Sequence, residues 1–458
     1  MIKKIRKLLG TCFLAAVLAV GSTVGVEAAV DTEATADSYP VDTDSWENWP
    51  QAPAILGVTG CLMDCNTGSI LYAKGMDIPR FPASITKIMT ALLVVENADL
   101  NAQVAFTETG LADAYGGSSN INPQIGEVFT VDQMLQMLLV KSANDVATQL
   151  GEYIGGSVDG FAERMNQRAA EIGCTNTHFA NASGLENDDH YTTAHDMALI
   201  MRTAIQYDRI REIMNTQSIS IPETNLGPAR YYDTHLLMLV PGNEYYYEGA
   251  LGGKTGYTPI SGCTLVMYAT RGDRTLIGVV MGGGDSNLIC TDMADLFDYG
   301  FNSFAFADMT GGNPYVSGGT ALLPVGMDPS VVNQVPTETP EGVTISYVYN
   351  GQNLGSGLMT KEAYDSWQAS LNPQPEEEAV TDGETAAADG DAADSDARSE
   401  EREKHRSGKV IGMYIAITVL AISIIACIIL LIITSDRVQR KLHRQKKDRD
   451  DEQDKKES

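Results

Sequence analysis

An uncharged apolar run near the C-terminus, Val410 to Thr434, sets the strongest limit on how this chain can be organised. It is long enough to span a lipid bilayer, and it has no polar face of the kind that an amphipathic surface helix needs. Basic residues follow it, from Arg437 to Lys447, and the positive-inside rule keeps such a tail in the cytoplasm. We therefore expect one transmembrane helix at 409–434, with the preceding chain outside the cell.

The N-terminus carries a second targeting signal. Basic residues between Lys3 and Lys7 precede the apolar stretch Leu8 to Val26, and Val26-Glu27-Ala28 fits a cleavage site. This is the pattern of a secretory signal peptide. The alternative, a retained N-terminal anchor, is disfavoured because the apolar stretch is short and interrupted by glycine. Both ends thus predict a single-pass membrane protein whose folded part is exported and whose C-terminus stays in the cytoplasm.

The segment before the apolar run is acidic and has almost no large apolar residues. Glu376 to Arg406 is rich in Ala, Asp, Glu and Ser, so it cannot bury enough surface to fold. It contributes to the formal net charge of −28 for the 458 residues. We expect a solvated tether here and no nucleic-acid partner, since the basic tail is explained by membrane topology and contact with lipid headgroups.

The predicted folded part contains a serine and a lysine one helical turn apart. Phe81-Pro82-Ala83 leads into Ser84, and the apolar residues from Ile85 to Leu93 repeat at helical spacing. Lys87 therefore lies on the same helix face as Ser84. A serine hydroxyl becomes a good nucleophile when a neighbouring base takes its proton, and a lysine can be that base if burial keeps it neutral.

Two further short motifs follow. Ser142-Ala143-Asn144 lies between an apolar stretch and Asp145, which predicts a loop between two helices. Lys254-Thr255-Gly256 precedes two β-rich runs, 264–269 and 275–280, that are joined by a turn at 271–274. This pattern predicts a strand followed by a hairpin. A lysine there adds positive charge to a cleft, and the glycine lets another backbone approach closely.

Each motif alone has an ordinary explanation. Ser84 can be a helix cap followed by an exposed lysine, Ser142 and Asn144 are residues that favour helix N-caps, and Lys254 can sit on the surface of a hairpin. Their occurrence in this order along one chain favours the catalytic interpretation.

With these motifs the chain resembles the low-molecular-mass penicillin-binding proteins, specifically the serine D-alanyl-D-alanine carboxypeptidases. The segments 64–74, 82–92 and 173–198 are similar as well, so the resemblance covers roughly residues 50 to 305. It implies the α/β transpeptidase fold shared with serine β-lactamases, in which an antiparallel sheet packed by helices lies beside a mostly helical region. The active site lies between the two.

The resemblance also implies the catalytic roles. Lys87 takes the proton from Ser84, which attacks the carbonyl between the two terminal D-alanines of a peptidoglycan stem peptide. The oxyanion lies against the backbone N–H groups of Ser84 and Tyr257. Ser142 and Lys254 relay a proton to the leaving D-alanine, and water hydrolyses the acyl-enzyme.

Substrate binding is implied for Asn144, Lys254, Thr255 and Gly256. The same serine is expected to be acylated by β-lactam antibiotics, which mimic the D-alanyl-D-alanine end. No cofactor and no metal is expected, because His190 and His195 have no metal-binding motif around them.

The chain departs from the family pattern at three places. Ala143 stands where many relatives carry glycine, and Tyr257 stands where some have histidine. Beyond residue 305, where the family often adds an all-β domain, only 320–325, 343–349 and 353–359 look strand-like. The extension is therefore expected to be shortened or lost.

Two other functions use the same pocket. A class A β-lactamase needs a deacylating glutamate in a Glu-x-x-x-Asn element, whereas Glu186 here has His190 four residues on. A non-enzymatic penicillin-binding sensor would lack Ser84, Lys87 or Lys254, and all three are present. Both are minor alternatives to the carboxypeptidase.

Five cysteines lie outside the two targeting segments: Cys61, Cys65, Cys174, Cys263 and Cys290. The odd number leaves at least one thiol unpaired in a monomer. In sequence order, the predicted organisation is a signal peptide (1–28), a flexible acidic segment (29–49), a catalytic domain (50–305), a short β-rich extension (306–370), a disordered acidic linker (371–408), a transmembrane helix (409–434) and a cytoplasmic tail (435–458).

Overall fold

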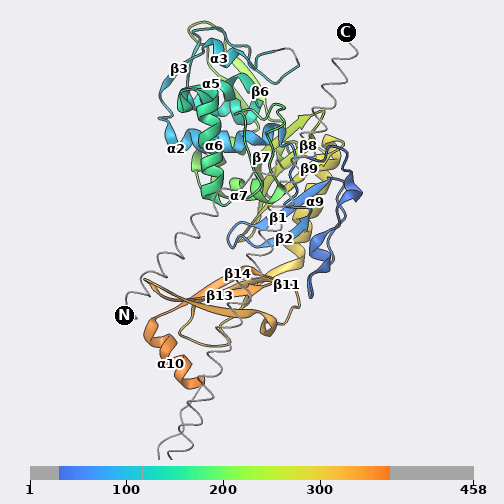
Figure 1. Cartoon of the computed structure of the whole chain (residues 1–458), viewed down its shortest axis with the longest axis vertical. Helices are drawn as coiled ribbons and strands as arrows, with labels where there is room; N and C mark the ends of the chain where they lie inside the picture. Colours follow the sequence, from blue (N-terminus) through green and yellow to red (C-terminus); the bar gives the residue numbers. More distant parts are fainter. Residues whose placement is uncertain (1–29, 116, 372–458) are drawn as a thin grey trace, which may run out of the picture. The chain divides into compact units, whose positions relative to one another are not determined.

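The computed structural model describes residues 30–115 and 117–371. Its central element is a five-stranded antiparallel sheet with the strand order β2-β1-β9-β8-β7 (Figure 1). The strands are β1 (Thr59–Asp64), β2 (Ile70–Lys74), β7 (Ala250–Thr258), β8 (Gly262–Arg271) and β9 (Arg274–Gly283). The antiparallel sheet predicted from the N-terminal hairpin and the strands around Lys254 is therefore confirmed.

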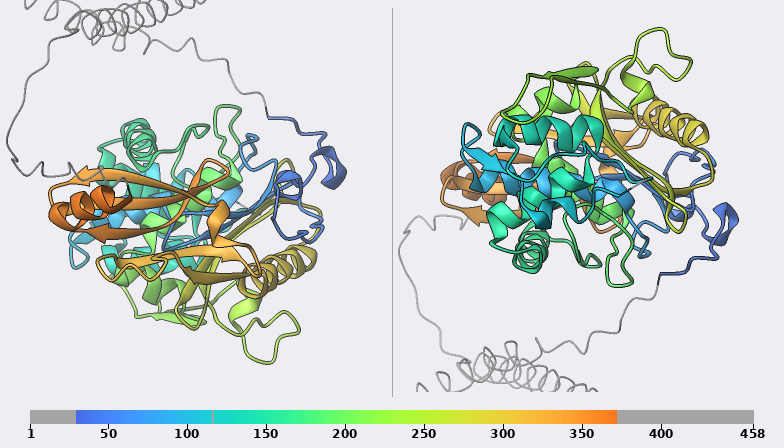
Figure 2. Two further views of the ribbon diagram at one scale, coloured as in Figure 1. Left: turned by 90° about the horizontal axis from the view of Figure 1, so that it is seen from below. Right: turned by 90° about the horizontal axis from the view of Figure 1, so that it is seen from above.

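The middle of this sheet is covered on both faces. Every residue of β1 is buried, and its side chains alternate between two cores, with Cys61 and Met63 in one and Leu62 in the other. Helix α9 (Ser286–Ser303) packs on the Leu62 face, whereas α7 (Ala194–Ala204) packs on the opposite face (Figure 2). Burial on both faces explains why these strands are continuous apolar runs.

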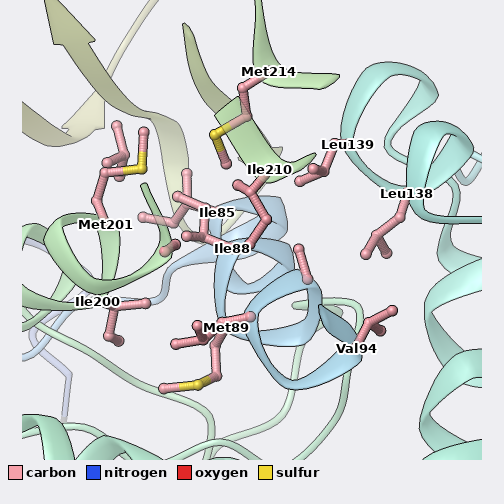
Figure 3. Packing of buried hydrophobic residues seen from close by; sticks show 14 of the residues in the cluster. Ile85, Ile88, Met89, Val94, Leu138, Leu139, Ile200, Met201, Ile210 and Met214 are labelled. Carbon is pink, nitrogen blue, oxygen red and sulfur yellow. The ribbon is translucent and has the colours of Figure 1, made fainter. Parts of the chain in front are cut away.

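The helical region is built around α2 (Lys87–Asn97), which follows a 3₁₀ turn at Ala83–Thr86. Side chains of this segment, such as Ile85, Ile88 and Met89, point into a core that also receives Ile200 and Met201 of α7 (Figure 3). The other elements of the region are β3 (Gln103–Ala105), α3 (Glu108–Leu111), β4 (Val128–Thr130), α4 (Val131–Gln136), a π-helical turn (Met137–Lys141), α5 (Asn144–Gly155), α6 (Val158–Ile172), α8 (Asp208–Met214), β5 (Ser218–Ile221) and β6 (Arg230–Asp233).

A second sheet follows α9, with the order β10-β11-β14-β13-β12. Its strands are β10 (Phe304–Asp308), β11 (Ser317–Pro324), β12 (Asn333–Thr339), β13 (Gly342–Tyr349) and β14 (Gln352–Met359), and α10 (Lys361–Leu371) comes after them. Three strands match the predicted ones, whereas β10 and β12 were not predicted. β12 gave no signal because nearly all its residues are exposed, so it lacks alternation. The predicted domain boundary at 305 falls within β10.

Residues 30–49, predicted to be flexible, instead follow a defined course. Val41 forms a β-bridge with Lys74, and the Trp49 indole donates a hydrogen bond of 2.9 Å to the carbonyl of Leu71. The Trp49 ring also lies 5.1 Å, centroid to centroid, from that of Phe304. Acidic composition suggested a solvated segment, but the half-buried Trp49 holds it against the sheet.

The predicted signal peptide, acidic linker, transmembrane helix and cytoplasmic tail lie outside the described residues. Within residues 30–115 and 117–371, no helix combines the length and the apolar character needed to cross a bilayer. The five cysteines in these residues are all free thiols.

Candidate active site

Ser84 lies in the tight turn that begins the central helix. The residue before it, Ala83, has a φ of 51°, a left-handed conformation that non-glycine residues rarely adopt. This turn directs Ser84 into an open cavity, and it places the serine at the positive end of α2. The prediction that Ser84 starts a buried helix is thus confirmed.

Lys87 is fully buried, and its Nζ contacts three oxygen atoms. It lies 2.9 Å from Ser84 Oγ, 2.7 Å from Asn144 Oδ1 and 2.6 Å from the carbonyl oxygen of Ser183. Burial, and after it the positive charge of Lys254, lowers the pKa of Lys87 well below that of an ordinary lysine. A neutral amine beside a serine hydroxyl is the arrangement that a general base requires.

Ser142 and Asn144 lie at a break between two helices. The π-helical turn ends at Lys141, Ser142 has a φ of 64°, and α5 begins at Asn144. The left-handed residue turns the chain so that Ser142 lines the cavity while the Asn144 amide reaches Lys87. The backbone N–H of Asn144 donates to the carbonyl of Ser119 at 2.7 Å, which fixes the break against a neighbouring loop. The predicted loop between helices is therefore present.

Lys254, Thr255 and Gly256 lie on β7, the edge strand of the central sheet. Lys254 is buried and donates to the carbonyl of Thr255 at 2.7 Å, and burial lowers its pKa to about 7. Thr255 and the exposed Tyr257 line the cavity. A Cβ atom on Gly256 would lie 2.8 Å from the backbone nitrogen of Ser84, so only glycine allows β7 to pass so close to the serine.

The three motifs converge on one cavity of about 720 Å³. Among the predicted site residues, Ser84, Ser142, Thr255, Gly256 and Tyr257 line it. Lys87, Asn144 and Lys254 are buried behind them: Lys87 hydrogen-bonds to Ser84, Lys254 to the Thr255 carbonyl, and Asn144 to Lys87. A cavity of this size is typical of small-molecule and peptide sites. Serine hydroxyls thus lie on its wall, and the amines of Lys87 and Lys254 lie directly behind it.

Sequence reasoning assigned no role to two neighbours of the site. The Ser183 carbonyl binds Lys87, and the Asn181 side chain accepts hydrogen bonds from the backbone of Ser183 and Gly184 at 3.1 and 2.7 Å. His190 is buried 2.8 Å from the hydroxyl of Thr86, and burial lowers its pKa to about 3, so it stays neutral. The residues from Asn181 to Gly184, Asn-Ala-Ser-Gly, are typical of a turn. This pattern was the signal in the sequence from which a turn at Ser183 could have been predicted.

His190 and His195 do not form a common site. His195 contacts Asp77 instead, at 3.0 Å. Within the described residues, no group of three or more His, Cys, Asp or Glu side chains is arranged to hold a metal ion.

Gly184 supplies a test of how tightly the catalytic turn is packed. It has a φ of 83°, and a Cβ atom there would lie 1.9 Å from the carbonyl oxygen of Ala83. We expect Gly184→Ala to lower the free energy of unfolding by about 3 kcal/mol and to slow penicillin acylation, because the Ser84 turn must move. Urea unfolding and acylation rates measure both effects. The matched control is Gly156→Ala, with a φ of 74° but open space around it, which should cost about 1 kcal/mol and leave acylation unchanged. Equal losses for both variants would contradict the packing argument.

Comparison with known proteins matches this geometry to one family. Residues 47–285 match the family described as D-alanyl-D-alanine carboxypeptidase, Peptidase_S11. The D-alanyl-D-alanine carboxypeptidase DacF of Bacillus subtilis is 31% identical over 246 residues, which cover 53% of this chain and 61% of DacF. DacB2 of Mycobacterium tuberculosis is 32% identical over 259 residues, which cover 55% of this chain and 84% of DacB2.

Solved structures agree with the sequence relatives. The crystal structure of the Streptomyces K15 DD-transpeptidase superposes with a TM-score of 0.52 at 30% identity, covering 55% of this chain and all of that one. The family match, residues 47–285, contains the central sheet, the helical region and all three motifs. The chain therefore belongs to the D-alanyl-D-alanine carboxypeptidase family, peptidase family S11.

Proposed function

We propose that this protein is a serine-type D-alanyl-D-alanine carboxypeptidase that removes the terminal D-alanine from peptidoglycan stem pentapeptides during cell-wall maturation. The observation that carries the proposal is the buried amine of Lys87 at 2.9 Å from the Ser84 hydroxyl in an open cavity. Family membership supports the same reaction.

The hydrogen-bond partners of Lys87 explain why its lone pair faces the Ser84 hydroxyl. A neutral amine has two N–H bonds and one lone pair. The Asn144 side-chain oxygen and the Ser183 carbonyl can only accept hydrogen bonds, so they take the two N–H groups. The lone pair is left for the third neighbour, the Ser84 hydroxyl, which donates its proton as the oxygen attacks the substrate carbonyl.

The remaining steps use groups that lie around the same cavity. The oxyanion is stabilised by the backbone N–H groups of Ser84 and Tyr257. The proton that Lys87 took from Ser84 is relayed through Ser142 and Lys254 to the amino group of the departing D-alanine, so that the C–N bond breaks and an ester to Ser84 remains. Water then attacks this ester, which releases the shortened peptide and restores the serine. Asn144 and Thr255 hold the substrate, and Gly256 leaves room for its backbone.

β-Lactams are expected to acylate Ser84, and the resulting acyl-enzyme is expected to be hydrolysed slowly. A class A β-lactamase removes them with a glutamate that activates water. Here Glu186 is exposed and is not among the residues that line the cavity. This observation favours the carboxypeptidase over the β-lactamase.

We also propose that the enzyme works outside the cell on a tether, held by a single transmembrane helix at 409–434 with the C-terminus in the cytoplasm. The described structure ends with α10 at Leu371, and all proposed site residues precede Thr258. The acidic stretch up to Arg406 behaves as a self-repelling coil with a reach on the order of tens of ångströms.

A secreted chain that ends near Leu371 is therefore expected to fold, to be released from cells and to liberate D-alanine from a short pentapeptide as fast as the full-length protein. Free D-alanine and the cell-bound fraction after a high-salt wash are measured, with the full-length chain as the control. Inactivity of the shortened chain would contradict the proposed catalytic domain, and its retention on membranes would contradict the proposed anchor.

A further inference from the structure

Two of the free cysteines lie in the wall of the active-site cavity. Cys263 on β8 and Cys290 on α9 both line it, and their exposed fractions are 7% and 6%. Neither is bonded to another cysteine. The other three cysteines of the described residues, Cys61, Cys65 and Cys174, lie away from this cavity. A small molecule that enters the cavity can therefore reach two thiols at once.

The backbone brings these two cysteines near each other. Cys263 pairs with Gly283 across the ladder between β8 and β9, and neighbouring strands lie about 4.8 Å apart. Gly283 in turn packs against α9: a Cβ atom on it would lie 3.5 Å from the Cβ atom of Ile289, the residue before Cys290. Both cysteine side chains belong to the same buried cluster. Helix α9 thus holds Cys290 against the strand pair that carries Cys263.

The charges around the two sulfur atoms agree with this proximity. Burial, and after it the charges of Cys263 and Asp285, raises the pKa of Cys290 to about 11. Burial and then the charge of Asp285 raise the pKa of Cys263 as well. Since an ionised Cys263 disfavours ionisation of Cys290, Cys263 is the first of the two to lose its proton. A thiol reacts through its thiolate, so this pair should react slowly at neutral pH and faster at higher pH.

We propose that Cys263 and Cys290 form an oxidisable dithiol, a modification site in the wall of the active-site cavity whose reagent is a small peroxide. The thiolate of Cys263 attacks one oxygen of hydrogen peroxide, so the O–O bond breaks, a sulfenic acid forms and hydroxide leaves. The sulfur of Cys290 then attacks the sulfenic sulfur, so the S–S bond forms and the S–OH bond breaks. The two thiol protons leave in water. Two thiols and one peroxide thus give one disulfide and two water molecules.

The disulfide acts on the catalytic groups through strand β8. Cys263 pairs with Tyr257 on β7, the residue whose backbone N–H is proposed to bind the oxyanion. A bond from Cys263 to α9 draws the β8 backbone toward the helix, and reaction rates are sensitive to displacements of about 1 Å at the reacting groups. We therefore expect the oxidised protein to be acylated more slowly than the reduced one. This inference goes beyond the proposed function and uses acylation of Ser84 only as a readout.

The test compares the reduced protein with protein treated with hydrogen peroxide at mildly alkaline pH. After treatment, peptide mapping without reductant should recover the peptides of Cys263 and Cys290 joined, with the loss of two hydrogen atoms. The rate of penicillin acylation should fall about tenfold. Dithiothreitol should separate the peptides and restore the rate. Because dithiothreitol reduces a disulfide and leaves methionine sulfoxide unchanged, recovery of the rate assigns the effect to the thiols.

Three variants locate the effect, each compared with itself before and after peroxide. Cys263→Ser and Cys290→Ser each lack one thiol, so their acylation rates should be the same before and after treatment. Cys174→Ser is the matched control, since Cys174 is a half-buried thiol outside the cavity that donates to the carbonyl of Asp196 at 3.7 Å, and it should still show the reversible fall.

Three outcomes would overturn the dithiol site: no joined peptide, a joined peptide with an unchanged acylation rate, or a reversible fall that both Cys263→Ser and Cys290→Ser retain. The peptide map does not depend on catalysis, so it tests the disulfide even in an inactive protein. If the reduced protein neither released D-alanine nor gained penicillin, the proposed function would be wrong, whatever the peptide map showed.

Discussion

Replacing Ser84 with alanine is expected to abolish D-alanine release and to prevent the protein from gaining the mass of one penicillin molecule. The hydroxyl oxygen is the atom that becomes acylated, and Lys87 is positioned to remove its proton at 2.9 Å. Loss of a serine nucleophile in comparable sites lowers the rate by more than about 10⁴-fold. Intact-mass spectrometry after incubation with penicillin, together with a D-alanine assay, measures both losses.

The fold should survive this substitution. Ser84 contributes one hydroxyl to an open cavity, so its removal creates no buried void, and the Tm should change little. Ser366→Ala on the exposed face of α10 is the control, and it should be acylated like the unaltered protein. A Ser84→Ala protein that still gained one penicillin would show that a different residue is the nucleophile.

The sequence allowed the parts of the site that depend on local spacing to be predicted. Ser84 and Lys87 are one helical turn apart, so their contact follows from helix geometry. The hairpin between β8 and β9 follows from two β-rich runs on either side of a turn, and its register closes with the pair Arg271 and Arg274, where the turn was predicted.

The parts that were not predicted depend on backbone atoms and on distant packing. The carbonyl oxygen of Ser183 is the third neighbour of Lys87, and a main-chain atom leaves no signature in residue type. The same holds for the close approach of Gly184 to Ala83, which follows from the fold rather than from either residue. Trp49 shows the opposite case: one half-buried aromatic residue holds in place a segment whose composition predicted a flexible one.

The second large effect separates the two lysines. Lys87→Ala should reduce penicillin acylation by more than about 10³-fold, because no general base remains beside Ser84. Lys254→Arg should retain a positive charge in the cavity and part of the activity, although the guanidinium group has a different shape. Lys74→Ala is the control for the loss of a buried lysine: its Nζ binds the carbonyls of Ile55 and Gly57, away from the cavity, so it should lower stability and leave acylation of the folded protein intact.

The pH dependence of acylation tests the separate roles of Lys87 and Lys254. The rate should rise with pH as Lys87 loses its proton, at a pH well below the usual lysine value, because burial and Lys254 lower its pKa. It should fall as pH increases through about 7, where Lys254 loses the charge that attracts the substrate carboxylate. Arginine stays protonated, so in Lys254→Arg this fall should disappear while the rise remains.

The free energy of unfolding depends on the same ionisation of Lys254. Between about pH 7 and 10.5 the unfolded chain still binds a proton at this lysine, whereas the folded chain has lost it. The free energy of unfolding should therefore increase as pH rises through that range. Stopped-flow acylation rates and urea unfolding across this range test both statements. Equal, small losses for Lys87→Ala and Lys254→Arg with unchanged pH profiles would show that Lys87 is not the general base and that Lys254 does not attract the substrate carboxylate.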